Sequence, residues 1–149
     1  MNSYEINEET IAILPSKEGK TKIIENDEEF FVEESPMKII ENSCNFFGSS
    51  YNGRFIGTKK LTGITHKAPI IIEESSEIIF FPTTSPRLNE CIWIAHKQIK
   101  NYFKDRYLTK ILFKNGKEIS IDMSYGSLNN QILRSARLES VLISRKKRK

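Results

Sequence analysis

Cysteine, histidine and tryptophan are scarce in this sequence, with two, two and one copies in 149 residues. Two cysteines without CxxC spacing do not make a disulfide framework, so we expect Cys44 and Cys91 to be reduced thiols. The sequence also has no P-loop, no GxGxxG and no convincing nucleophile–base pair. These absences argue against an enzyme, and we expect no cofactor.

Long apolar runs are missing as well. The longest clusters, Ile70–Ile72 and Ile78–Phe81, have the length of a strand and not the ~18 residues of a membrane span. The N-terminus, MNSYEINEE, is polar and acidic, unlike a signal peptide. We therefore expect a cytoplasmic protein with no membrane partner.

Acidic residues are few outside the N-terminal region. Residues 1–34 hold ten acidic and three basic residues, whereas residues 35–149 hold nine acidic and twenty basic ones. A basic body predicts a polyanionic partner. The length and the 38% hydrophobic content favour one domain, which we place at residues 1–143, followed by a basic tail at 144–149.

The hydrophobic pattern predicts an α+β domain built mainly on antiparallel sheet, with two consecutive helices after the N-terminal strands and one C-terminal helix. Strands are expected at Ser3–Ile6, Thr10–Leu14, Lys22–Glu25, Glu29–Glu33, Pro69–Glu73, Glu77–Phe81, Cys91–Ala95, Gln98–Lys104, Leu108–Lys114 and Lys117–Asp122. The first two strands are expected to pair as a hairpin around residues 7–9, and Asn115-Gly116 signals another hairpin.

Serines mark the three expected helix starts. Ser35 precedes Pro36 in the arrangement typical of an N-cap and first helical position, and Gly48 is the expected stop. Ser49-Ser50 predicts a second helix that runs to about Leu61, and Ser124 predicts the last helix.

The segment Phe46–Lys67 carries four formal charges, all positive, among six hydroxyl side chains and four glycines. Cations and hydroxyls bind phosphate oxygens, and glycine lets a backbone come close. We interpret this segment as the nucleic-acid-facing part of the protein. An ordinary solvated helix and loop is the alternative.

The sequence contains the phrases CNFFGSSYNGR at 44–54, ITHKAP at 64–69, FFPT at 80–83, SPR at 85–87 and CIWIAH at 91–96. Together these phrases resemble the competence transcription factor (ComK-type) family of Gram-positive bacteria. The resemblance covers roughly residues 3–140 and implies a transcription activator of competence genes. It further implies binding of double-stranded DNA at A-run/T-run boxes through the minor groove, as a homodimer or as paired dimers.

The resemblance also implies nucleoid association, with RNA polymerase and a proteolytic adaptor as further partners. Members of the family continue beyond the last helix, so we expect this chain to be a member shortened at the C-terminus. The alternative is a shortened paralogue that acts as an antagonist, or as a protein-interaction module without activation function.

Ten residues are predicted to contact DNA: Ser49, Ser50, Tyr51, Arg54, Thr58, Lys59, Lys60, His66, Lys67 and Arg87. Narrow A-tracts concentrate negative potential that an inserted arginine exploits, and Arg54 is the first candidate for that role. The lysines are expected on phosphates, and Arg87 is a second groove candidate. For Tyr51 the alternative is a core position.

Three further sets of residues are less specific. Arg134 and Arg137 on the last helix face either DNA or a dimer partner, and the tail Arg145–Lys149 adds phosphate contacts. Cys44, His66, Cys91 and His96 are the four residues that would make a tetrahedral zinc site. Because neither CxxC nor HxxxH occurs and both cysteines lie in apolar segments, we predict no metal.

Overall fold

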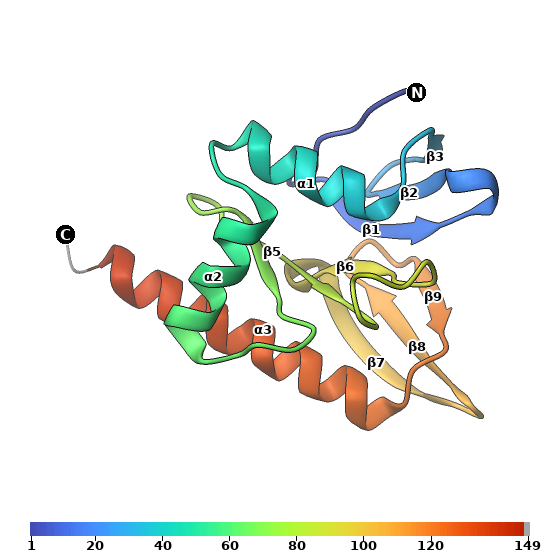
Figure 1. The fold of residues 1–149 in the computed structure, drawn as a ribbon. Helices are drawn as coiled ribbons and strands as arrows, with labels where there is room; N and C mark the ends of the chain where they lie inside the picture. The colour runs from blue at the N-terminus through green and yellow to red at the C-terminus, as the bar shows by residue number, and fades with distance from the viewer. Residues whose placement is uncertain (148–149) are drawn as a thin grey trace.

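The computed structural model describes residues 1–147, which form two antiparallel sheets and three α-helices (Figure 1). The strands are β1 (Thr10–Pro15), β2 (Thr21–Glu25), β3 (Glu29–Val32), β4 (Ile70–Glu73), β5 (Ile78–Pro82), β6 (Trp93–Ala95), β7 (Ile99–Asp105), β8 (Leu108–Phe113) and β9 (Glu118–Ile121). The helices are α1 (Pro36–Phe46), α2 (Tyr51–Thr62) and α3 (Tyr125–Lys146), with short 3₁₀ turns η1 (Lys17–Gly19) and η2 (His96–Gln98). The predicted α+β class, with mainly antiparallel sheet, is confirmed.

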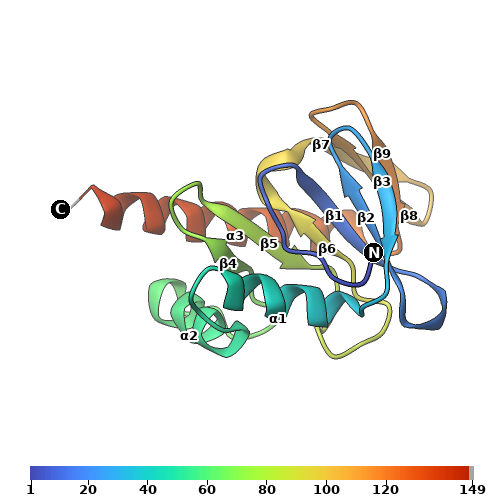
Figure 2. The ribbon, with the colours of Figure 1, turned by 90° about the horizontal axis from the view of Figure 1, so that it is seen from above.

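The larger sheet has the strand order β3-β2-β1-β6-β5-β4, and the smaller sheet has the order β7-β8-β9. Helices α1 and α2 lie together on one side of the larger sheet (Figure 2). The smaller sheet and the first half of α3 cover its other side, where Phe113 and Leu128 belong to one buried cluster with residues of β1, β5 and β6. Within the described residues, no helix is both long and apolar enough to cross a membrane.

The central strands are buried on both faces, which explains their continuous apolar sequences. In β5, Phe80 packs into the cluster under α1 and α2, while Phe81 packs into the cluster under the smaller sheet. Trp93 and Ile94 divide in the same way in β6. Successive strand residues point to opposite faces, so a strand with helices on one side and a second sheet on the other carries apolar residues at every position.

All three expected helix starts are confirmed by capping hydrogen bonds. The hydroxyls of Ser35, Ser50 and Ser124 accept from the backbone N–H three residues on, at 3.3, 2.9 and 3.1 Å. Such a cap contributes about 1 kcal/mol to helix stability. Gly63 ends α2 with a left-handed φ of 80°, and its N–H donates to the Lys59 carbonyl at 2.7 Å.

One expected strand is wrong. Residues 1–7 form no strand, and β1 pairs with β2 and β6 instead. Because both edges of β1 are occupied, no hairpin around residues 7–9 is available. Ser3–Ile6 instead lies along α1, where the Ile6 N–H donates to the Ser43 hydroxyl at 2.9 Å, and Tyr4 and Ile6 are buried.

Helix α3 is long, at 22 residues, and ends at Lys146. Its buried positions Leu128, Gln131, Ser135, Leu138 and Leu142 recur at spacings of three and four, which keeps one face on the protein throughout. The helix therefore includes Arg145 and Lys146 of the predicted basic tail. The tail residues Arg148 and Lys149 lie outside the described residues.

Candidate nucleic-acid interface

The predicted DNA-contact residues divide between two sides of α2. On one side is the loop groove, a hollow of about 450 Å³ lined by Met37, Tyr51, Asn52, Phe55, Thr65, His66, Lys67, Ala68, Ser85, Pro86 and Arg87. On the other side is the α3 groove, of about 350 Å³, lined by Ser49, Gly53, Arg54, Gly57, Lys60, Leu61, Ile71, Glu74, Leu142, Arg145 and Lys146. An α-helix makes one turn every 3.6 residues, so neighbouring residues of α2 point to different sides of the helix.

The loop groove is built from three separate stretches of chain. The first turn of α2 contributes Tyr51, whose ring centroid lies 6.4 Å from that of the fully buried Trp93, in an edge-to-face arrangement. Burial raises the pKa of the Tyr51 hydroxyl. Tyr51 is therefore half-buried against the core, as the alternative for it predicted, and it also lines the groove. Its contact with DNA stays a prediction.

The segment 63–69 forms the second wall, and hydrogen bonds from α2 and α3 fix its backbone. The Thr58 hydroxyl donates to the Pro69 carbonyl at 2.7 Å, and Gln131 of α3 donates to the Lys67 carbonyl at 2.9 Å. Thr58 itself is fully buried. It fixes the wall and does not reach the surface, so the expectation that it contacts DNA is corrected.

The third wall is the loop between β5 and β6. Its base is fastened by two hydrogen bonds between Thr83 and Ile92, at 2.9 and 3.0 Å. Pro86 restricts the backbone next to Arg87, whose side chain is exposed. Among residues 1–147, neither Arg87 nor Lys67 has an ion-pair partner, and no aspartate or glutamate is among the described residues that line the groove.

Arg54, the first candidate for minor-groove insertion, is engaged in the α3 groove. Its guanidinium donates to Glu74 at 2.9 Å, and its side chain is only 15% exposed. Its Nε is buried without a partner in the described part of the chain. To contact DNA, Arg54 must break its ion pair with Glu74 and bind the DNA in its place.

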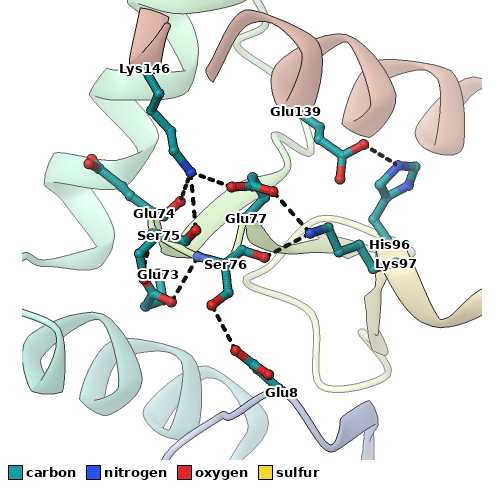
Figure 3. A network of polar contacts seen from close by, with 10 residues as sticks. All are labelled: Glu8, Glu73, Glu74, Ser75, Ser76, Glu77, His96, Lys97, Glu139 and Lys146. Atoms are coloured by element: carbon teal, nitrogen blue, oxygen red, sulfur yellow. Dashed lines mark hydrogen bonds and ion pairs between the residues drawn. The ribbon is translucent and has the colours of Figure 1, made fainter. Parts of the chain in front are cut away.

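Glu74 belongs to the acidic turn, residues 74–77 between β4 and β5, which also binds the side chains of two lysines from other elements (Figure 3). The Lys146 ammonium donates to the carbonyls of Glu74 and Ser75, at 2.9 and 3.1 Å, and pairs with Glu77. Lys97 donates to Glu77 at 3.1 Å. Hydrogen bonding by Lys146, followed by Lys97, lowers the pKa of Glu77, and much of the positive charge on this side is therefore neutralised internally.

The remaining predicted contacts lie at the two ends of α2. Ser50 uses its hydroxyl oxygen to cap the helix, and its neighbour Ser49 lines the α3 groove. Lys59 and Lys60 are exposed in the last turn, and the described residues provide no ion-pair partner for either. These two lysines remain available for phosphate.

The structure does not bring the four zinc candidates together as a ligand set. Cys44 and Cys91 are buried in the apolar cluster under α1 and α2, and burial raises the pKa of Cys44 to about 11. His66 is exposed, and His96 lies 3.9 Å from Glu139. Within residues 1–147, no three metal-ligating side chains are placed to hold an ion.

Two residues of the site were not predicted in their observed roles. Arg134 was expected to face DNA or a partner, but its guanidinium donates to the His66 carbonyl and to Gln131. Gln131 is buried and holds the same segment. The signal that could have identified this role is a polar residue, Gln131, three positions after the apolar Leu128 of the last helix.

Comparison with known proteins supports the predicted resemblance. Residues 1–147 match the sequence model of the family described as ComK protein. The chain is 44% identical over 147 residues to the competence transcription factor of Bacillus subtilis (strain 168). The alignment covers 94% of this chain and 75% of that protein. No solved structure matches the chain significantly.

Proposed function

The chain belongs to the ComK protein family, and on that premise we propose that it is a transcription regulator that binds double-stranded DNA. The observation that carries the proposal is the loop groove. Two cations from different loops, Lys67 and Arg87, flank a hollow to which no described acidic residue contributes. Positive side chains on rigid supports are what binding to a phosphate backbone requires.

Lys67 and Arg87 have different roles in this proposal. Lys67, with the Thr65 and Ser85 hydroxyls that also line the groove, binds backbone phosphate and sugar. Arg87 enters the minor groove, because it is exposed on a loop stiffened by Pro86 and fastened at its base. In the minor groove A·T and T·A present similar acceptors, so specificity there depends on width and potential.

Arg54 is a second, conditional contact. Its pairing with Glu74 means that any contact with DNA costs the loss of that pair. Lys59 and Lys60 of α2 add phosphate contacts beside it. We therefore assign sequence preference mainly to Arg87 and treat the α2 residues as contributors to affinity.

The proposal includes activation of competence genes by a homodimer, or by paired dimers, on adjacent A-run/T-run boxes. A two-fold symmetric protein matches symmetric half-sites, and half-sites one helical turn apart present the same face of the duplex. In that role the protein acts at the nucleoid, together with RNA polymerase, and its level is set by a proteolytic adaptor. A promoter–reporter assay distinguishes an activator from an antagonist.

The proposal is tested by competition binding at fixed, near-physiological salt. One duplex carries two A-run/T-run boxes one helical turn apart, and the other carries a scrambled sequence of the same length. We expect a preference of about a hundredfold, equivalent to ~2.7 kcal/mol, with two or more protein copies on the paired boxes.

The other outcomes overturn specific parts of the proposal. Equal binding to both duplexes would leave a basic protein with non-specific affinity. Absence of binding to either duplex would support the alternative, a protein-interaction module. Preferential binding by a single copy would remove the dimer from the proposal while leaving the sequence preference.

A further inference from the structure

We infer that Gln131 and Arg134 of α3 are positioning residues that set the shape of the loop groove, and thereby its sequence preference. The inference rests on the proposed function of that groove. It concerns a part of the molecule that does not line the groove at all, since neither residue is among its lining side chains.

Gln131 connects three parts of the structure through one buried amide. It is 1% exposed, and its Nε2 donates to the Lys67 carbonyl at 2.9 Å and to the Pro82 carbonyl at 2.7 Å. Pro82 ends β5 and leads directly into the loop that carries Arg87. The same amide therefore fixes the backbone beneath two of the three walls of the groove.

Arg134 completes this arrangement one turn further along α3. Its guanidinium donates to the oxygen of the Gln131 amide and to the His66 carbonyl. The bond to the amide oxygen orients the Gln131 side chain, so that both Nε2 hydrogens are available for the two carbonyls. His66 and Lys67 are thus held at successive carbonyls by two neighbouring side chains of one helix.

The held segment has a conformation that needs such support. Lys67 has a φ of 47°, in the left-handed region that non-glycine residues rarely adopt because it strains the backbone. Without the hydrogen bonds from Gln131, the segment and the start of the loop between β5 and β6 relax, and Arg87 loses its fixed position, while the flexible Lys67 side chain still reaches phosphate. Shape-dependent recognition suffers from such a displacement, while attraction to phosphate does not.

The test uses the full chain with Gln131→Met, which keeps the size of the side chain but removes both donors. Ser135→Ala is the matched control, because Ser135 is buried on the same face of α3 and its hydroxyl donates to the Gln131 carbonyl, without touching the groove. We expect Gln131→Met to reduce the preference for A-run/T-run duplex over scrambled duplex by roughly tenfold, since a groove contact carries discrimination of that order. The salt dependence of binding stays as in the parent protein, and Ser135→Ala changes neither quantity.

A second readout needs no DNA. Limited trypsin digestion, followed by mass spectrometry, compares cleavage after Lys67 with cleavage after Lys20, an exposed site beside η1. We expect Gln131→Met to accelerate cleavage at Lys67 by roughly tenfold relative to Lys20, because local opening governs cleavage. Arg134→Lys, which keeps the charge and serves if Gln131→Met does not fold, gives a smaller increase.

The outcomes separate this inference from the proposed function. If the parent protein prefers the A-run/T-run duplex and Gln131→Met and Arg134→Lys retain the full preference, the inference is wrong and the proposed function stands. Unchanged relative cleavage at Lys67 also overturns the inference. If the parent protein shows no preference, the proposed function fails, and the cleavage ratio alone still decides whether α3 positions the segment.

Discussion

Neutralising Glu74 is expected to weaken folding and strengthen DNA binding at the same time. Glu74→Gln removes the charge that pairs with Arg54 at 2.9 Å, while the shape of the side chain is kept. Because the Glu74 side chain is 59% exposed, solvent screens the pair, and its contribution is about 0.2–1 kcal/mol. The free energy of unfolding, measured in urea, should fall by about that amount.

The free energy of the Arg54–Glu74 pair, which stabilises the fold, opposes DNA binding. Arg54 gives up Glu74 when it contacts DNA, so removing the pair lowers the cost of binding by up to about 1 kcal/mol, or roughly fivefold in affinity. The assay is binding to the A-run/T-run duplex at fixed salt. Glu41→Gln is the matched control, since Glu41 is an exposed acid of α1 that has no ion pair among the described residues.

A double-mutant cycle with Arg54→Ala identifies the route of this effect. If Arg54 exchanges partners, the gain from Glu74→Gln disappears once Arg54 is gone. An equal gain from Glu41→Gln, or a gain that persists without Arg54, would refute the exchange and leave only a long-range effect of charge.

Three further variants test the supports of the site and its core. Thr58→Val leaves the Pro69 carbonyl without its donor and should lower the free energy of unfolding by about 1–3 kcal/mol in urea denaturation; no loss would show that water replaces the hydroxyl. Gly57→Ala should raise stability by about 1 kcal/mol, because alanine is the better helix former and the added Cβ meets no atom within 4 Å apart from its own helix backbone and chain neighbours. Lower DNA affinity of this variant would show that DNA passes close to α2 there. Because the pKa of Cys44 is raised from 9.0 to about 11, the folded state holds the thiol proton more tightly, so stability is lost as the pH rises through that range. Cys44→Ala should flatten this part of the pH profile of stability, and an unchanged profile would assign it to other groups.

Local sequence signals predicted most of the secondary structure correctly. Serine caps fixed the three helix starts within a residue, because a helix N-terminus needs a side-chain acceptor and few residue types supply one. The Asn115-Gly116 signal correctly placed the turn between β8 and β9, where Gly116 has a positive φ of 92°. The error at Ser3–Ile6 arose because the tertiary structure, and not the local sequence, decides which strands pair with β1. The local pattern does not reveal that β6, more than 75 residues away, occupies the edge of β1.

The candidate site was predicted in its residue types but not in its arrangement. The basic segment and Arg87 were identified because cations and hydroxyls are visible in a sequence. Their division between two sides of α2 depends on the helix phase and on loops folded back from elsewhere. The pairing of Arg54 with Glu74 joins residues 20 positions apart, and the support of Lys67 by Gln131 spans 64 positions. No local signal specifies contacts at such separations.

The central claim is that the loop groove binds DNA, with Arg87 in the minor groove and Lys67 on phosphate. The most direct measurement is the affinity of Arg87→Ala, Lys67→Ala and a control, Lys17→Ala, for the A-run/T-run and scrambled duplexes over a range of salt. We predict that Arg87→Ala loses about 1–3 kcal/mol of discrimination, while Lys67→Ala keeps discrimination and lowers the salt slope by about 0.9 on both duplexes. Lys17→Ala should have little effect, because Lys17 is exposed on η1 and is not among the residues that line the groove. Parent-like discrimination and salt slope in both groove variants would contradict the account.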